Sequence, residues 1–429
     1  MERTDLILVR NARLPHGNAT HDVLASAGRI AAIAHNLPPP PGARVIEADG
    51  QLLSPPFVDP HFHMDAALSH GVPRVNESGT LLEGIALWGE LKPLLTQQVL
   101  VDRALQYCDW AVARGLLAIR THVDVCDDRL LAVEALLQVR KTVAPYLDLQ
   151  LVAFPQDGLL RSPSALANLK RALDMGVDVI GGIPHFERTM DEGARSVQLL
   201  CELAAQRALP VDMHCDESDD PMSRHVETLA FHTQRLGLQG RVTGSHLTSM
   251  HSMDNYYVSK LLPLMRDAQL HVVANPLINI TLQGRQDTYP KRRGMTRVPE
   301  LMAGGINVAF GHDCVMDPWY SLGSGDMLEV AHMGLHVAQM TSQAQMRACF
   351  DAVTVNAARV MGLQGYGIEV GNHADFVLLQ ARDAIEAIRL RAHRLLVVRR
   401  GRVIAQAAPG RSTLHLPDRP HRVDWTLKR

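Results

Sequence analysis

The sequence has little of what marks a disulfide-rich, nucleic-acid-binding or membrane protein. Only six of its 429 residues are cysteine. They lie far apart, from Cys108 to Cys349, and no two form a C-x-x-C pair, which argues against a disulfide framework and a cysteine zinc site. Lysine and arginine (43) nearly balance aspartate and glutamate (45). The net charge of −2 therefore gives no field that would attract nucleic acid or an anionic membrane.

Long hydrophobic runs are also lacking. No stretch of about 18 apolar residues occurs, so no transmembrane helix is expected. The first residues lead directly into a strand-like stretch, without the basic and apolar regions of a signal peptide. We therefore expect a cytoplasmic protein with neither a membrane nor a nucleic-acid partner. A chain of 429 residues is long enough for a large barrel and a smaller module.

The middle of the chain alternates short apolar strands with amphipathic helical stretches, which is typical of βα units around a parallel sheet. The predicted strands end near Pro60–His63, Arg120–Val125, Leu151–Gln156, Val179–His185, Val211–His214, Val242–His246, Val272–Asn275 and Val308–Asp313. Helical patterns between them include Leu100–Arg114, Leu130–Val143, Pro163–Met175 and Gly193–Gln206. Eight such units predict an α/β fold, a closed (β/α)8 TIM barrel.

Both ends of the chain show short β segments separated by glycine, proline and asparagine. These segments are 5–10, 28–33 and 44–48 near the start, and 374–379 and 394–404 near the end. We expect one small β-sandwich module built from both termini. The predicted division is residues 1–54 and 374–429 for this module, and residues 55–373 for a metal-dependent catalytic barrel.

Polar or ionisable residues end almost every predicted barrel strand, and the C-terminal strand ends form the active-site face of a TIM barrel. In Pro60-His61-Phe62-His63, strand alternation points His61 and His63 to the same side. Two imidazoles in this arrangement can share a divalent metal. The alternative is a chance H-x-H on a surface strand.

Three later strand ends carry the same kinds of residue. His214 closes one strand and Glu217 follows in the loop, which suggests a third ligand and a proton shuttle. The alternative for this loop is a solvated acidic face. His246 ends the next strand, and Asp313 at the eighth strand completes the ligand set. A bound metal brings the pKa of water towards neutrality, and Asp313 can accept the proton that this water loses.

Longer motifs make the sequence similar to the amidohydrolase superfamily, and closely so to its bacterial cytosine deaminases, over nearly the whole chain. The motifs that carry this resemblance are Ser78-Gly-Thr-Leu-Leu-Glu-Gly-Ile, Arg120-Thr-His-Val-Asp-Val, Val152-Ala-Phe-Pro-Gln, Ile183-Pro-His-Phe-Glu, Val272-Val-Ala-Asn-Pro-Leu, Leu282-Gln-Gly-Arg-Gln-Asp-Thr-Tyr-Pro-Lys-Arg-Arg-Gly, Asp317-Pro-Trp-Tyr-Ser-Leu-Gly and His332-Met-Gly-Leu-His. The resemblance implies one Fe(II) or Zn(II) ion per subunit and a homo-oligomer, with a hexamer as the expected size.

The resemblance also implies which residues hold the metal. The positions that match the family's ligands are His61, His63, His214 and Asp313. The fourth strand lacks the lysine that bridges two metals in related hydrolases, which supports a single ion. His122 and Asp124, at the end of the second strand, are expected to support the ligands rather than to join them.

Further positions match the residues that handle the substrate in that family. Glu217 matches the proton shuttle to the ring nitrogen, and His246 matches the residue that orients the attacking hydroxide. Gln156 matches the amide that reads the ring carbonyl and the adjacent N–H, since an amide can donate and accept together. Leu81 and Trp319 match walls of the substrate pocket.

The sequence departs from the family pattern at Cys314. Cytosine deaminases of the family usually carry a second acidic residue here, facing the C5 edge of the pyrimidine. Cysteine behaves as a small hydrophobe, so the exchange leaves an apolar niche, and one methyl group in it is worth about 0.8 kcal/mol. The sequence thus resembles the branch of the family that accepts 5-methylcytosine. The alternative is that the exchange is neutral drift and cytosine remains the substrate.

Together these residues predict the hydrolytic deamination of a free pyrimidine base with release of ammonia. The expected reactions are 5-methylcytosine to thymine and cytosine to uracil, with 5-fluorocytosine as a further substrate. One alternative is another amidohydrolase reaction, such as isoguanine or creatinine deamination or cyclic amide hydrolysis. Another is a non-catalytic metal-binding barrel, but a scaffold has no use for the set of Glu217, His246 and Asp313.

Overall fold

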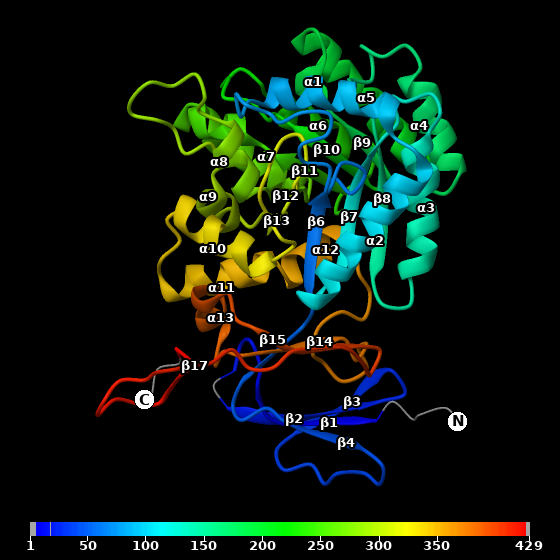
Figure 1. The fold of residues 1–429 in the computed structure, drawn as a ribbon. Coiled ribbons are helices and arrows are strands. Elements are labelled where there is room, and N and C mark those ends of the chain that lie inside the picture. The colour runs from blue at the N-terminus through cyan, green and yellow to red at the C-terminus, as the bar shows by residue number, and fades with distance from the viewer. Residues whose placement is uncertain (1–5, 18, 426–429) are drawn as a thin grey trace.

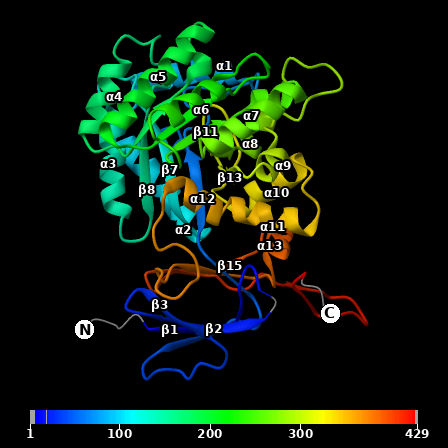
Figure 2. The same cartoon turned by 180° about the vertical axis from the view of Figure 1, so that it is seen from behind.

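The computed structural model describes residues 6–17 and 19–425. Residues 1–5, 18 and 426–429 lie outside the described residues, and with them Asp5, the first residue of the first predicted strand. The chain forms a barrel and, beyond one end of it, a sheet made from the two ends of the chain (Figures 1 and 2). Within the described residues, no helix combines the length and the apolar character needed to cross a membrane.

Eight parallel strands form the barrel in the order of the chain. They are β6 (Phe57–Phe62), β7 (Leu116–Asp124), β8 (Asp148–Phe154), β9 (Val179–Gly182), β10 (Val211–Cys215), β11 (Val242–His246), β12 (His271–Ala274) and β13 (Asn307–Phe310). A parallel bridge between Phe62 and Asp313 joins the last strand to the first. The expected TIM barrel is confirmed, and the polar strand ends meet at one face of it.

Helices surround the barrel in the order expected of βα units (Figure 1). They are α2 (Gln97–Ala113), α3 (Leu131–Val143), α4 (Ala165–Asp174), α5 (Met190–Arg207), α6 (His225–Arg235), α7 (Asn255–Asp267), α8 (Pro276–Leu282), α9 (Val298–Ala303), α10 (Met327–Val337), α11 (Gln343–Ala352) and α12 (Val355–Met361), with short 3-10 turns η1 (Lys92–Leu94), η2 (Pro184–Phe186) and η3 (Thr248–Ser252). A further helix, α13 (Ala384–Leu390), connects two strands of the second sheet and packs on α10 and α11. In α2 the buried side chains of Leu100, Ala104, Tyr107 and Ala111 follow the spacing of one helix face.

Helix α1 (Leu81–Leu91) is not among the helical stretches named from the sequence. It lies across the end of the barrel where the strand ends meet (Figure 1). Thr80 caps its first turn, because its side chain accepts a hydrogen bond from the backbone N–H of Glu83. The helix buries Leu87, Trp88 and Leu91 against the barrel and so covers the polar strand ends.

The two ends of the chain share one sheet, in the order β16-β15-β14-β5-β1-β2-β3, with β4 paired to β1. Its strands are β1 (Ile7–Arg13), β2 (Thr20–Ser26), β3 (Arg29–Ala34), β4 (Arg44–Glu47), β5 (Leu52–Ser54), β14 (Phe376–Leu379), β15 (Arg394–Arg399) and β16 (Arg402–Gln406); β17 (Ser412–Thr413) and β18 (Arg422–Val423) form a separate pair. Leu53 in β5 pairs with Leu378 in β14. The expected β module of both termini is therefore confirmed.

Candidate active site

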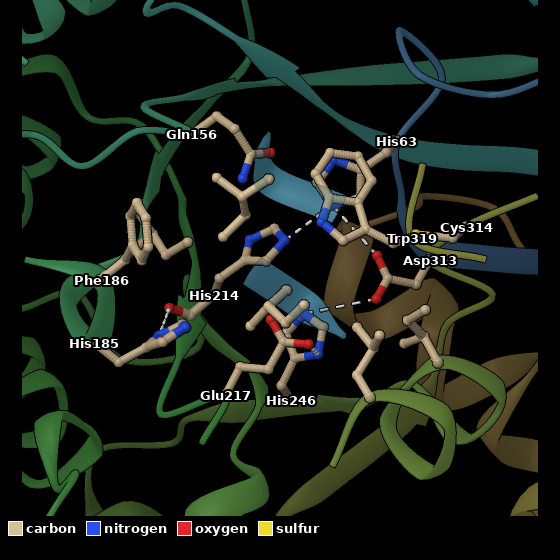
Figure 3. A pocket seen from close by; sticks show the side chains of 15 residues that line it. His63, Gln156, His185, Phe186, His214, Glu217, His246, Asp313, Cys314 and Trp319 are labelled. Carbon is tan, nitrogen blue, oxygen red and sulfur yellow. Dashed lines mark hydrogen bonds and ion pairs between the residues drawn. The ribbon is translucent and has the colours of Figure 1, made fainter. Parts of the chain in front are cut away.

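A cavity lies at the C-terminal ends of the barrel strands. It is lined by His63, Leu81, Ile85, Gln156, Ile183, His185, Phe186, His214, Glu217, His246, Ile278, Leu282, Asp313, Cys314 and Trp319 (Figure 3). All the residues expected to contact the substrate or to catalyse the reaction are in this set. The apolar members from η2 and α8, and Ile85 from α1, were not predicted, because they come from segments whose position is set only by tertiary packing.

Three imidazoles and one carboxylate converge beneath this cavity. They are His61, His63, His214 and Asp313, and one ligand atom from each lies within 4.8 Å of every other. His63 Nε2 is 2.9 Å from His214 Nε2 and 3.3 Å from Asp313 Oδ1. His61 Nε2 is 3.4 Å from the same oxygen and has no hydrogen-bond partner among the described residues. Buried polar atoms left in this state are costly, and these donors suit a divalent metal ion.

Two members of the cluster, Asp313 and His214, have pKa values shifted towards the protonation states that metal ligands need. Burial opposes ionisation of Asp313, but the nearby imidazoles of His61, His246 and His63 hold its pKa well below the usual value. Burial, with the charges of His61 and other nearby histidines, holds the pKa of His214 well below 6.5. An ionised carboxylate and a neutral imidazole are the forms that bind a metal ion.

Behind the ligands, a second layer of polar side chains fixes their orientation. His122 Nε2 lies 3.0 Å from His61 Nδ1, on the side of the ring away from the carboxylate of Asp313. His122 Nε2 also lies 3.9 Å from Asp212 Oδ1. Asp212 accepts a hydrogen bond from Ser245 Oγ at 2.7 Å and pairs with Arg120 Nη1 at 2.9 Å. A partner on Nδ1 leaves His61 Nε2 facing the other three residues of the cluster, which is the arrangement expected if His122 supports a metal ligand.

Asp124 does not support the ligands as expected. Its Oδ2 accepts a hydrogen bond from Trp88 Nε1 at 2.8 Å and lies 3.0 Å from Lys92 Nζ. The same ammonium group pairs with Asp157, in the loop that follows Gln156. Because α1 packs over the end of β7, the carboxylate of Asp124 is used to hold this helix and not the metal site.

Glu217 stands on the floor of the cavity beside His246 (Figure 3). Its Oε1 lies 3.4 Å from His246 Nδ1, and His246 Nε2 lies 3.8 Å from Asp313 Oδ2. Burial, with the charge of Asp313, raises the pKa of Glu217 well above its ordinary value. A raised pKa favours the protonated form, which is the form that can donate a proton to a bound ligand.

The loop that carries Glu217 is held by its neighbour Asp216. This buried carboxylate accepts hydrogen bonds from Ser223 Oγ (2.7 Å) and from the backbone N–H groups of His225 (3.0 Å) and Val226 (2.9 Å). These bonds tie the end of β10 to the first turn of α6. Negative charge at a helix N-terminus is favourable, so the loop is fixed and Glu217 keeps its place.

The other walls come from Gln156, Trp319 and α1. Trp319 lies against α1 at Gly84, where a Cβ atom would stand only 2.2 Å from the indole Cδ1. Its ring centroid is 6.1 Å from that of Trp88 in the same helix. Because Gly84 has no side chain, the indole of Trp319 has room to pack against α1. The indole forms one wall of the cavity, which Cys314 also lines.

Comparison with known proteins agrees with this geometry. Residues 44–405 match the amidohydrolase family. The structure is similar to that of 5-methylcytosine deaminase from Klebsiella pneumoniae liganded with 5-fluorocytosine, with a TM-score of 0.92 and 42% identity over 96% of this chain and 100% of that one.

Two characterised relatives resemble the chain over most of its length. N-isopropylammelide isopropyl amidohydrolase of Pseudomonas sp. (strain ADP) is 29% identical over 407 residues, which are 93% of this chain and 97% of that protein. Pterin deaminase of Rhizobium rhizogenes is 28% identical over 360 residues, or 83% of this chain and 81% of that protein. Since the family match spans most of the sequence, this protein belongs to the amidohydrolase family.

Proposed function

We propose that this protein is a metal-dependent deaminase of free pyrimidine bases, which converts 5-methylcytosine to thymine and cytosine to uracil with release of ammonia. 5-Fluorocytosine is a further expected substrate. The observation that carries the proposal is the meeting of Glu217, the four-residue candidate ligand cluster and the amide of Gln156 around one small cavity. The similarity to a 5-methylcytosine deaminase over nearly the whole chain supports the same reaction.

Each residue of the site has a separate role in the proposed deamination. A divalent ion held by the four ligands supplies Lewis acidity, which lowers the pKa of water. Gln156 donates and accepts at the carbonyl and N–H edge of the ring and so orients it. Glu217 passes its proton to the ring nitrogen, which makes the amine-bearing carbon electrophilic, while His246 orients the attacking water. The ionised carboxylate of Asp313 accepts the proton that the water loses.

The ligand set fits either Fe(II) or Zn(II), because three imidazoles and one carboxylate suit both ions. We expect a chelator to abolish turnover and either ion to restore it. Asp313→Asn should reduce both turnover and metal content, since it removes the only negatively charged ligand in the cluster. Elemental analysis of the purified protein measures the metal, and Asp351→Asn on α11 is the control. Full activity in the metal-free protein would overturn the proposed mechanism.

The substrate is tested by ammonia release from 5-methylcytosine and cytosine, measured side by side as kcat/KM. We expect 5-methylcytosine to be preferred by about tenfold, which corresponds to about 1.4 kcal/mol in the transition state. Mass spectrometry of the product shows whether the ring is retained. An opened ring, or turnover of isoguanine or creatinine only, would indicate another reaction of the amidohydrolase family.

Cys314 carries the expected preference for a 5-methyl group. Burial raises the pKa of its thiol well above the usual value, so the side chain is neutral and weakly polar. We expect Cys314→Asp to lower the ratio of kcat/KM for 5-methylcytosine over cytosine by at least about fourfold, the equivalent of one buried methyl group. Cys314→Ala is the control and should keep a preference for the methylated base. An unchanged ratio of the two kcat/KM values in the aspartate variant would contradict the proposal that an apolar niche at Cys314 favours the 5-methyl group.

Two further properties belong to the proposal. The resemblance to bacterial cytosine deaminases supports a homo-oligomer, with a hexamer as the expected size, which light scattering measures. The six cysteines, all in the described residues, are free thiols, and this supports a reducing cytoplasm.

A further inference from the structure

Lys92 stands at the end of α1, where its side chain is largely buried beside the ends of two barrel strands. Its Nζ lies 3.0 Å from Asp124 Oδ2 and 2.5 Å from Asp157 Oδ2. Asp124 is the last residue of β7, and Asp157 follows β8, one position after Gln156. A single ammonium group therefore connects α1 to the ends of two neighbouring barrel strands.

The loop that carries Gln156 is held from two sides. On one side, Glu187 Oε1 accepts a hydrogen bond from the backbone N–H of Leu159 at 2.7 Å. On the other side, Asp157 pairs with Lys92. The side-chain amide of Gln156 lines the cavity (Figure 3) but forms no hydrogen bond within the described residues. Its position therefore depends on this backbone, and its donor and acceptor atoms stay free for a ligand.

The same ammonium group is tied to the helix that covers the cavity. Trp88 in α1 donates its indole N–H to Asp124 at 2.8 Å, so this carboxylate receives both the indole and the ammonium group. The helix also supplies Leu81 and Ile85 to the lining of the cavity. Because Asp124 is almost completely buried, loss of the ammonium group would leave its carboxylate without a counter-charge, and this penalty keeps the groups together.

We propose that Lys92 is a positioning residue for substrate binding, which through Asp157 fixes the loop that presents the amide of Gln156 and joins that loop to α1. Lys92 is not among the residues that line the cavity, so it acts through these neighbours and does not touch the ligand. The cover of the cavity and the amide that orients the ring are then set by one contact. This inference rests on the proposed function, in which Gln156 pairs with the carbonyl and N–H edge of the base.

Two variants break this contact in different ways, and a third serves as the control. Lys92→Met removes the charge but keeps most of the length of the side chain. Asp157→Ala removes only the loop side of the contact and leaves the pair between Lys92 and Asp124, so it still tests the proposal if the methionine variant does not fold. Arg74→Met removes a cation that pairs with two glutamates on the exposed side of the same helix.

A double-mutant cycle with Gln156→Ala tests whether Lys92 acts through this amide. We expect Lys92→Met and Asp157→Ala to raise KM for both bases by about fivefold or more and to change kcat by less than about threefold, since a contact made in both the ground state and the transition state affects KM. In the Gln156→Ala background, the same changes should raise KM by less than about twofold.

The Kd of thymine, measured by calorimetry, gives the same comparison where turnover is too slow to yield KM. An equal loss of affinity in both backgrounds would overturn the proposal, because Lys92 would then act independently of Gln156. A loss as large in Arg74→Met would overturn it as well, since any ion pair that stabilises α1 would then have the same effect.

A second readout does not depend on activity. Hydrogen exchange of the backbone N–H groups in residues 155–160 is followed by mass spectrometry in the metal-loaded protein without substrate. We expect exchange to be about tenfold faster in Lys92→Met and Asp157→Ala than in the wild type and Arg74→Met, because the loop loses an attachment. Unchanged exchange overturns the inference even if deamination proceeds. Faster exchange in these variants of a protein whose wild type deaminates neither base supports the hold of Lys92 on the loop and counts against the proposed function instead.

Discussion

Glu217→Gln is expected to lower kcat by roughly 10²–10⁴-fold, the usual worth of a positioned general acid. The glutamine fills the same space in the cavity but has no proton to pass to a ring nitrogen. The wild-type side chain is poised for this transfer, because burial and the charge of Asp313 raise its pKa well above the ordinary value. Stopped assays of ammonia release measure the loss.

Metal content and product affinity distinguish a lost proton transfer from a damaged site. Glu217 is not among the four clustered ligands, so the variant should hold as much metal as the wild type. Binding of thymine, measured by calorimetry, should change little. Glu134→Gln, at an exposed position of α3, serves as the control and should be fully active. Turnover within a few-fold of wild type in the Glu217 variant would mean that another group supplies the proton.

Gly84→Ala is expected to lower kcat/KM by about 10²-fold, the scale of a displacement of 1 Å at a reacting centre. The added Cβ would stand 2.2 Å from Cδ1 and 2.6 Å from Nε1 of Trp319. The indole must then move into the cavity, or α1 must lift from the barrel. Either movement disturbs the wall against which the substrate is held.

Gly89→Ala in the same helix is a matched control for this change. A Cβ at position 89 meets no heavy atom of the described residues within 4 Å. Replacing a glycine inside a helix by alanine is worth up to about 1 kcal/mol, so this variant should be at least as stable as the wild type and equally active. If both variants behave alike in thermal unfolding and in kcat/KM, the close approach of Trp319 to α1 has no functional role.

The barrel could be predicted because its strands are short, buried and separated by amphipathic helices. All six residues of β6 are buried, for example, and two histidines stand at its end. Alternation within a strand determines which side chains share a face, so His61 and His63 could be placed together without a structure. The closed barrel then brings His214 and Asp313 beside them. Their roles in binding and catalysis stay predictions, as do the exact domain boundaries.

The cover of the cavity could not be predicted in the same way. The segment of α1 carries a usable signal, since Thr80 and Glu83 have the spacing of a helix cap. Its position over the strand ends, however, depends on how Trp88 packs and on the absence of a side chain at Gly84. Asp124 was expected to support the metal ligands, because nothing in the sequence shows that the indole of Trp88 hydrogen-bonds to it instead. Long-range packing of this kind has no periodic pattern.

The sheet shared by the two termini determines the order in which the protein can be completed during synthesis. Strand β5 pairs with β14, and Leu53 pairs with Leu378. Because Leu378 leaves the ribosome more than three hundred residues after Leu53, this pairing cannot form until most of the chain has been synthesised. The barrel strands lie between these two positions and can pair as they emerge. Until β14 pairs with β5, the nascent chain carries an open β edge, which is a site for unwanted pairing with other chains. The C-terminal strands, which are synthesised late, therefore cover the exposed edge of the N-terminal strands.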